Sequence, residues 1–520
     1  MHVYSFKLIS LSLSTFLLSM LIAGVAMAAE SCQTVAGHLA TAEGQVDVQR
    51  SGASAWREGL LGSALCKGDT VRAGANSRAT VVLVNQAVLR IDQNTAMRLD
   101  NITGVTEERS SLSLLKGAFQ SFSRKPRSLE VSTPYLNGSI EGTEFVFRVK
   151  DNESELTVLE GVVVASNSQG SVTVSGGECA SAQPGQAPQI RTVVRPRDAV
   201  QWSLYYPPIM VASAQPSIQN AAVLLSVGRV DEARAEIDKA LQQDPNAGEA
   251  YALSAVINVT LNNNEQALAD ANKAVTLSPD SSSALIALSY AQQAVFDIPG
   301  ATDTLRQAVK QQPDDALAWA RLSELQLMAG ERRQASVSAE KAVSLQPNIA
   351  RAQITLGFAA LAEFRNDDAR DAFQKAINSN PSDPLPHLGL GLATISAGEL
   401  EQGRAEIELA VALDSNDSLY RSYLGKSYFE EKRAPLDSEQ FAIAKQLDPN
   451  DPTAYLYDGI AKQTVNRPVE AVEDLERSIE LNDNRAVYRS RLLLDKDRAA
   501  RGTSLARAYN DLGFEQLGIK

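Results

Sequence analysis

Hydrophobic and polar positions follow two different patterns along the chain. From Gly44 to about Val174, short runs of alternating apolar and polar residues are separated by Gly, Asn, Asp and Pro. In the segment FVFRVK at 145–150, Phe145 and every second residue after it are apolar and would share one face of a strand. This pattern predicts β-strands joined by turns, and therefore an all-β sandwich or barrel.

After about residue 214 the chain repeats with a period of 34 residues. The octet KAVTLSPD at 273–280 returns as KAVSLQPN at 341–348, two periods later. Stepping by 34 from Pro279 meets Pro at six of eight positions, with Ser415 and Asp483 as the exceptions, and Ala or Ser stands five residues before each position. Small residues let helices approach closely and Pro ends a helix, so the repeat predicts stacked helix–turn–helix units.

The repeat resembles the tetratricopeptide repeat (TPR), whose pattern is an aromatic residue, Leu-Gly, Ala, an apolar residue, Ala and Pro. The positions that fit it are Trp319, Leu322, Leu356-Gly357, Phe373, Leu390-Gly391 and Leu424-Gly425. Asp437 and Arg421 depart from the pattern. The resemblance covers residues 214–485 and implies eight units that form an all-α solenoid. We expect residues 486–520 to form a helical cap, because an uncovered end exposes apolar surface; a curtailed further unit is the alternative.

The β segment resembles the FecR domain, the envelope domain of bacterial iron-signalling regulators. The stretches that carry this resemblance include GQVDV at 44–48, KGDTVRAG at 67–74, VSTPYLNGSIEGTEFVF at 131–147 and TVLEGVV at 157–163. We predict structural roles for the motif residues Gly68, Asp69, Gly142, Thr143, Phe145, Glu160 and Gly161. The whole chain is then expected to be multidomain: an all-β FecR-like sandwich or barrel domain followed by an all-α TPR solenoid.

The first 28 residues predict export from the cytoplasm. An apolar run from Leu8 to Val25 follows Lys7 and ends at Ala26-Met27-Ala28, which is typical of a cleaved signal peptide; an uncleaved membrane anchor is the alternative. No later segment is expected to cross a bilayer. The expected division is a signal peptide at 1–28, the FecR-like domain at 29–179, a linker at 180–213, eight repeats at 214–485 and the cap at 486–520.

Export has two consequences for the interpretation. The iron-signalling regulators carry a cytoplasmic segment that controls a sigma factor, whereas here the export signal directly precedes the FecR-like domain, so we do not expect direct control of transcription. A periplasmic or secreted location would also permit one disulfide among Cys32, Cys66 and Cys179. The sequence leaves the pairing open.

Composition and motifs favour binding over catalysis. The net charge is −13, which disfavours nucleic acid as a partner. Of the three His residues, His38 and His387 are far apart, and no metal-ligand spacing occurs. The GKS triplet at 425–427 lacks the earlier Gly of a phosphate-binding loop, since Tyr420 stands there. We therefore expect no catalytic residues, no bound metal and no cofactor.

In arrays of this type, the first helix of each unit lines a concave groove. Counting from each Pro places apolar residues at these positions, and we predict that they bind a peptide: Val256, Val259, Ile286, Tyr290, Leu327, Ile354, Phe358, Leu361, Leu388, Leu392, Ile395, Phe429 and Ile460. Only Arg351 and Lys426 could serve a clamp for a C-terminal carboxylate, which argues against one. An exposed apolar strip implies an occupant, either a partner's helix or extended peptide or this chain's own tail or linker. The alternative is that the side chains pack between neighbouring repeats.

The linker carries an aromatic cluster, Trp202, Tyr205 and Tyr206, which either packs one domain on the other or forms a binding patch. We favour packing. The function expected from these features is that of an exported, non-enzymatic scaffold for protein partners, with an envelope receptor or polymer at the FecR-like domain. The alternative is a periplasmic sensor component of an iron or envelope signalling pathway. An enzyme acting on envelope polymers has little support.

Overall fold

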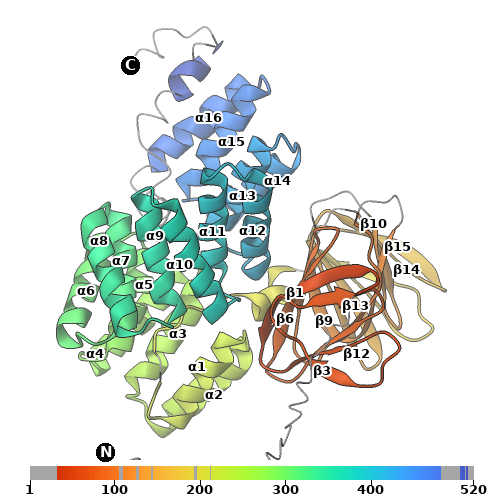
Figure 1. The fold of residues 1–520 in the computed structure, drawn as a ribbon, viewed down its shortest axis with the longest axis horizontal. Coiled ribbons are helices and arrows are strands. Elements are labelled where there is room, and N and C mark those ends of the chain that lie inside the picture. The colour runs from red at the N-terminus through yellow and green to blue at the C-terminus, as the bar shows by residue number, and fades with distance from the viewer. Residues whose placement is uncertain are drawn as a thin grey trace, which may run out of the picture.

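The computed structural model describes residues 32–104, 109–123, 128–141, 144–192, 196–210, 212–481, 504–509 and 511–512. A region made of strands is followed by a long run of helices, and the two lie beside each other (Figure 1). The predicted export segment, the motif residues Gly142 and Thr143, and most of the predicted cap lie outside the described residues. In the described part, no helix combines the length and the apolar character that a membrane span requires.

Within the described residues, the first region contains seventeen strands. They are β1 (Val35–Glu43), β2 (Val46–Gln49), β3 (Trp56–Glu58), β4 (Ala64–Cys66), β5 (Thr70–Ala73), β6 (Arg78–Leu83), β7 (Val88–Ile91), β8 (Ala96–Asn101), β9 (Ser110–Phe122), β10 (Ser128–Ser132), β11 (Asn137–Glu141), β12 (Glu144–Lys150), β13 (Glu153–Glu160), β14 (Val162–Asn167), β15 (Gly170–Ser175), β16 (Glu178–Ala182) and β17 (Gln189–Thr192).

The strands form two layers that share β9. One layer has the order β4-β1-β6-β7-β9-β12-β13-β16-β17, and the other has the order β3-β2-β5-β8-β9-β10-β11-β14-β15. The strand passes between the layers at Gly117, whose φ is 86°. A Cβ there would lie 2.2 Å from Thr95 Oγ1, so the bend requires glycine. The result is an open sandwich, not a closed barrel.

Three aromatic rings lie at the centre of the sandwich. Phe119 from β9 packs against Phe145 and Phe147 from β12, with ring centroids 5.9 and 6.2 Å away, and all three side chains are fully buried. A disulfide joins Cys32, just before β1, to Cys66 at the end of β4, which is the neighbour of β1 in the same layer. Cys179 is a buried free thiol.

A 3₁₀ helix, η1 (Pro196–Ser203), leads from the sandwich into the helical region. In the described part of that region, sixteen α-helices follow in pairs. They are α1 (Pro216–Ser226), α2 (Val230–Gln243), α3 (Gly248–Thr260), α4 (Asn264–Leu277), α5 (Ser282–Ala294), α6 (Ile298–Gln311), α7 (Ala316–Ala329), α8 (Arg332–Leu345), α9 (Ala350–Ala362), α10 (Asn366–Ser379), α11 (Pro384–Ser396), α12 (Leu400–Leu413), α13 (Ser418–Glu430), α14 (Leu436–Leu447), α15 (Pro452–Thr464) and α16 (Pro468–Glu480).

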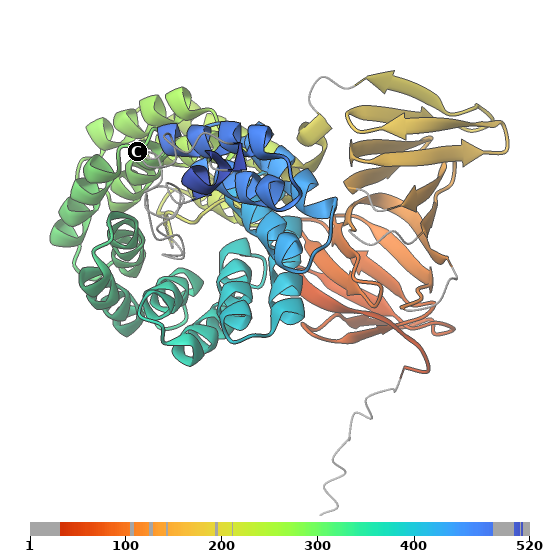
Figure 2. The same ribbon diagram turned by 90° about the horizontal axis from the view of Figure 1, so that it is seen from above.

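The small residues of the repeat lie where helices touch. Each Ala or Ser that stands five residues before the periodic Pro position is buried: Ala240, Ala274, Ala308, Ala342, Ala376, Ala410, Ala444 and Ser478. The Leu-Gly positions act in the same way. Phe373 of α10 is wedged between two first helices, because a Cβ on Gly357 or Gly389 would come within 2.6 or 2.3 Å of its ring. The pairs curve into a ring (Figure 2), which also rises along its axis, so that α16 lies far from α1 (Figure 1).

Candidate functional site

The thirteen apolar residues that were predicted to line an open groove are not exposed in the structure. Nine are buried and belong to the main hydrophobic cluster of the array: Val256, Ile286, Tyr290, Leu327, Ile354, Phe358, Leu361, Leu388 and Leu392. Four are half-buried: Val259, Ile395, Phe429 and Ile460. The expectation of an exposed apolar strip is therefore wrong, because neighbouring hairpins cover these side chains. Peptide binding by this side of the array stays a prediction.

Part of the linker also lies against the array. Leu204, Tyr206 and Ile209 are buried in the same hydrophobic cluster as the helices, together with Val88 and Phe122 of the sandwich. Of the aromatic cluster, Trp202 and Tyr206 are buried, which fits the packing interpretation. Tyr205 is half-buried and lines a cavity instead.

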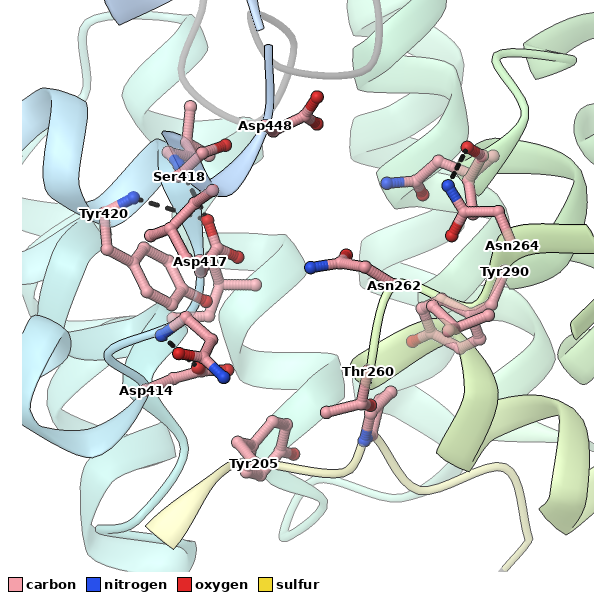
Figure 3. A pocket seen from close by; sticks show the side chains of 18 of the residues that line it. Tyr205, Thr260, Asn262, Asn264, Tyr290, Asp414, Asp417, Ser418, Tyr420 and Asp448 are labelled. Atoms are coloured by element: carbon pink, nitrogen blue, oxygen red, sulfur yellow. Dashed lines mark hydrogen bonds between the residues drawn. The ribbon is translucent and has the colours of Figure 1, made fainter. Parts of the chain in front are cut away.

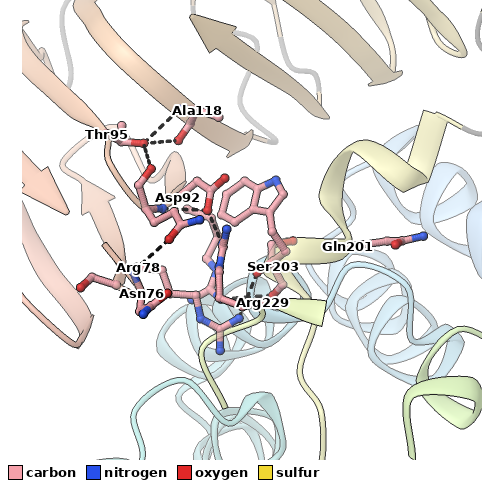
Figure 4. Close-up of polar contacts among 12 residues, drawn as sticks. Asn76, Arg78, Asp92, Thr95, Ala118, Gln201, Ser203 and Arg229 are labelled. Atoms are coloured by element: carbon pink, nitrogen blue, oxygen red, sulfur yellow. Dashed lines mark hydrogen bonds and ion pairs between the residues drawn. The ribbon is translucent and has the colours of Figure 1, made fainter. Parts of the chain in front are cut away.

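Buried charges join the sandwich to the first repeat (Figure 4). Arg78 of β6 binds Glu43 at 2.7 Å, and its guanidinium donates to the carbonyl oxygens of Trp202 and Leu204, each at 3.2 Å, and of Ser226 at 3.0 Å. Close by, Asp92 after β7 pairs with Arg229 before α2. A guanidinium that is buried this deeply fixes its partners in place, since each unsatisfied donor would be costly.

A second set of buried contacts joins the sandwich to the other side of the ring. Arg421 of α13 binds Glu144 of β12 at 2.6 Å and donates to Gln440 and to the carbonyl oxygen of Ser415, each at 3.1 Å. Glu43 of β1 accepts a hydrogen bond from Ser382, just before α11. The sandwich therefore bridges the first hairpin and the hairpins of α11 and α13, which the curvature of the array has brought near each other.

This curvature leaves a partly open cavity of about 210 Å³. Figure 3 shows two facing walls: Asp414, Asp417, Ser418, Tyr420 and Asp448 on one side, and Asn262, Asn264 and Tyr290 on the other, with Tyr205 and Thr260 at the base. The acidic wall is made by the turns around α13 and by the end of α14, whereas the opposite wall comes from α3 to α5. Residues more than 150 positions apart in the chain thus face the same space.

The cavity carries more negative than positive charge. Its acidic residues are Asp383, Asp414, Asp417 and Asp448, and the single basic residue that lines it, among those described, is Arg351. Burial raises the pKa of Asp414 to about 7 and raises the pKa of Tyr205 well above its usual value. Burial opposes the charge of Arg351, but Tyr290 and Asp383 outweigh it and keep the pKa of Arg351 raised. The site therefore holds a permanent cation and, in Asp414, a carboxylate that is difficult to ionise.

Family comparisons divide the chain in the same way as the structure. The family model described as FecR protein matches residues 69–164, and a tetratricopeptide repeat model matches residues 219–282 and 354–418. The chain contains a FecR domain and TPR repeats. The FecR match falls within the sandwich, and the TPR matches fall within the sixteen helices. No match was found among curated proteins.

Solved structures resemble the helical part of the chain only distantly. The Cut9-Hcn1 hetero-tetramer of the APC/C is 18% identical with a TM-score of 0.45, over 57% of this chain and 56% of that one. A human IFIT1 dimer with PPP-AAAA is 16% identical with a TM-score of 0.41, over 58% and 80%. The TPR protein TTC0263 of Thermus thermophilus is 23% identical with a TM-score of 0.31, over 34% and 96%. At these scores they add nothing to the family matches.

The motif residues of the FecR domain that the structure describes lie in its core and turns. Asp69 is buried and accepts hydrogen bonds from Arg50 at 2.5 Å and from the Cys66 amide at 2.7 Å. Gly68 and Gly161 have φ angles of 84° and 83°, and Gly161 forms the turn between β13 and β14, directly after the half-buried Glu160. The contacts of Asp69 and the backbone angles of the two glycines are consistent with structural roles, which stay a prediction for the motif as a whole.

No set of three or more His, Cys, Asp or Glu side chains in the described part could hold a metal ion. The structure nevertheless brings the two distant histidines near one carboxylate. His387 bonds Glu406 of α12 at 2.8 Å, and the same carboxylate influences His38 on β1, whose pKa is lowered by burial and partly restored by Glu406. These residues belong to the contact between the FecR domain and the TPR array.

The sequence did not predict the cavity or the residues that line it. Asp383, Asp417 and Asp451 stand 34 residues apart, at the start of the first helix of successive repeats, and Asp414 and Asp448 form a second such set. The repeat therefore contained the signal that these side chains line up along the array. What the sequence could not show is that the array curves far enough to set them opposite Asn262 and Tyr290.

Proposed function

We propose that this protein is an exported, non-enzymatic scaffold of the bacterial cell envelope, and that its TPR array binds a protein partner in the cavity inside the ring. FecR and TPR domains are typically non-catalytic, and together they support a role in protein interaction and signalling. The observation that carries the proposal is the partly open cavity inside the ring, because TPR repeats suggest protein partners and this cavity leaves space for a segment of one.

The nature of this cavity favours an extended polar segment over an amphipathic helix. A helix bound in a groove needs a row of exposed apolar contacts, and the candidate residues are covered by neighbouring hairpins. The cavity offers carboxylates, amides and tyrosine rings instead. An extended peptide presents both backbone and side-chain polar groups, which such a lining can bind.

Export is supported by the apolar segment at residues 8–25 and agrees with the disulfide between Cys32 and Cys66, because disulfides persist in oxidising compartments. The experiment for this part is cell fractionation of the full chain with and without residues 1–28. We expect the full chain in the periplasm and the shortened chain in the cytoplasm. The same distribution for both would contradict export by this segment.

The partner site can be tested by photo-crosslinking in intact cells. A photoreactive amino acid at Thr260, at the base of the cavity, is expected to give an adduct with an envelope protein. The matched control carries the same amino acid at Val337, which is exposed on α8. No adduct from position 260, or the same adducts from both positions, would contradict binding in the cavity.

The FecR match at residues 69–164 favours a second candidate, a periplasmic sensor component of an iron or envelope signalling pathway. In this function the partner is a receptor of the outer membrane. The same crosslinking experiment separates the two candidates, since the sensor function requires that the adduct contain a TonB-dependent receptor.

A further inference from the structure

Two buried side chains of opposite charge line the cavity and leave hydrogen-bonding atoms unused. Arg351 on α9 is 6% exposed and Asp383 before α11 is 1% exposed. Among the described residues, Arg351 has no hydrogen bond or ion pair; its guanidinium lies 6.0 Å from the ring of Tyr205. Asp383 Oδ2 has no hydrogen bond of normal geometry within the described part of the chain, although its carboxylate lies near enough to Tyr205 to add to the effect of burial in raising the pKa of that phenol. The two charges attract each other, but a buried polar atom without a hydrogen bond is destabilising, so each of these groups calls for an explanation.

Helix capping explains only one of the two carboxylate oxygens of Asp383. Its Oδ1 accepts the amide of Leu385 at 3.0 Å and so caps α11. Asp451 caps α15 in the same way two repeats later, but there Oδ2 accepts a hydrogen bond from Ser418 at 3.1 Å. Asp383 also lines the cavity, and among the described residues its equivalent oxygen has no such partner. The protein fold therefore uses both oxygens of Asp451 and only one of Asp383.

The two unused groups define the charge of the ligand. Arg351 offers donors for a carboxylate, and Asp383 with the wall of Asp414, Asp417 and Asp448 offers acceptors for an ammonium or guanidinium. The volume of about 210 Å³ corresponds to about seven waters and suits one or two amino-acid side chains. Tyr205 and Tyr290 add aromatic surface on which a cationic side chain can lie.

We propose that the cavity binds an extended segment of a partner protein in which a basic residue adjoins an acidic one, with the acidic side chain on Arg351 and the basic side chain on Asp383 and the acidic wall. This inference rests on the proposed function and specifies the chemistry of its partner. The ligand carries a positive and a negative side chain next to each other. This feature distinguishes it from a purely basic or a purely acidic peptide.

The test uses the full chain and four end-capped model peptides in isothermal titration calorimetry. The central pair of the peptides is Lys-Glu, Lys-Gln, Gln-Glu or Gln-Gln, between alanines. We expect the Lys-Glu peptide to bind and the loss of either charge to weaken binding about tenfold or more. No binding of the Lys-Glu peptide, or equal binding of all four, overturns the inference. The crosslink at position 260 would survive that result, so failure of this inference and failure of the proposed function are distinguishable.

Variants assign each charge to its partner. Arg351→Met should remove the preference for Glu over Gln and keep the preference for Lys, whereas Asp383→Asn, which keeps the cap, should do the reverse. Asp315→Asn is the matched control, because Asp315 caps α7 in the same way but does not line this cavity, and this variant should bind like the parent. A merely structural role would weaken all peptides without altering their order, and this outcome overturns the inference. If Arg351→Met fails to fold, Arg351→Gln replaces it.

The source of the ligand is settled by one further titration. The free Lys-Glu dipeptide, with charged termini, is compared with the end-capped peptide. A partner segment is expected to bind only in the end-capped form. Binding of the free dipeptide alone would show a small-molecule site and overturn the assignment to a partner protein.

Discussion

At the scale of single residues, the aspartates at helix starts can make two kinds of contact, one with each carboxylate oxygen. Asp315, Asp383, Asp417 and Asp451 each accept a backbone amide with one carboxylate oxygen, and this cap stabilises the helix that follows. The other oxygen is available for contacts that differ between repeats. Capping alone is a sufficient reason for these residues, so a functional role must be argued from the second oxygen.

Two buried aspartates, Asp451 at the start of α15 and Asp414 at the end of α12, should make stability depend on pH. Burial raises the pKa of Asp451 and of Asp414 from 3.8 to about 7, so the folded chain keeps protons that the unfolded chain has lost between about pH 4 and 7. The free energy of unfolding contributed by these groups therefore falls as the pH rises through this window. We expect a melting temperature about 2–4 °C higher at pH 6 than at pH 8.

The variant Asp451→Asn provides the control for this effect. It retains the cap and removes the titrating group, so the difference between pH 6 and pH 8 should become smaller. Thermal unfolding followed by circular dichroism at both pH values is the measurement. An unchanged difference in the variant would show that other groups cause it.

At the scale of elements, the first helix of each hairpin is more deeply buried than we expected. A helix that lines an open groove would expose one face. In α9, the ring of Phe358 packs against Phe373 with centroids 4.8 Å apart, and the side chain is 3% exposed. Such a helix is apolar on nearly all sides, because hairpins before and after it and its own partner helix all contact it. The positions that would face a ligand in an open array here join the core.

The substitution Phe358→Glu tests this arrangement. It places a carboxylate in the core, so we expect a loss of about 4 kcal/mol or more in the free energy of unfolding, or failure to fold. Phe364→Glu is the control: Phe364 is 74% exposed after the same helix and should change stability by less than about 0.5 kcal/mol. Chemical denaturation measures both. A stable Phe358→Glu protein that no longer crosslinks to its partner would instead favour an open apolar groove.

At the scale of the whole molecule, the FecR domain and the TPR array are joined by buried ion pairs as well as by the linker. Arg78 holds the linker and the first repeat, whereas Arg421 holds the seventh hairpin. The sandwich therefore connects parts of the ring that the chain separates by about 200 residues. A flexible tether between two independent modules would lack such contacts.

Loss of one of these charges should uncouple the two parts. Arg421→Met leaves Glu144 buried without its main partner and should lower the free energy of unfolding by about 3–5 kcal/mol. We expect calorimetry to show separate transitions for the sandwich and the array in this variant. The exposed pair of Arg477 and Glu480 is the control, since Arg477→Met should have little effect. A single unaltered transition in Arg421→Met would contradict a coupled structure.

The sequence determined the two classes of secondary structure and their order. Alternation and turn residues predicted strands, and the 34-residue period with its small residues and Pro predicted paired helices, because both patterns depend on contacts close in the chain or repeated in every unit. The residues that form the cavity could be recognised only as caps. Nothing local distinguishes Asp383, with an unused oxygen, from Asp451, whose two oxygens are both bound.

Only the tertiary structure decided which residues of distant hairpins face each other. A small rotation at each hairpin, accumulated over the array, closes a ring, buries the expected groove and sets Asp414 across from Tyr290. The same curvature places Arg421 beside Glu144 and leaves Arg351 Nε without a hydrogen bond to any of the described residues. Curvature is the sum of many packing angles, each set by side chains of adjacent hairpins, and so it cannot be read from the repeat pattern that all the hairpins share.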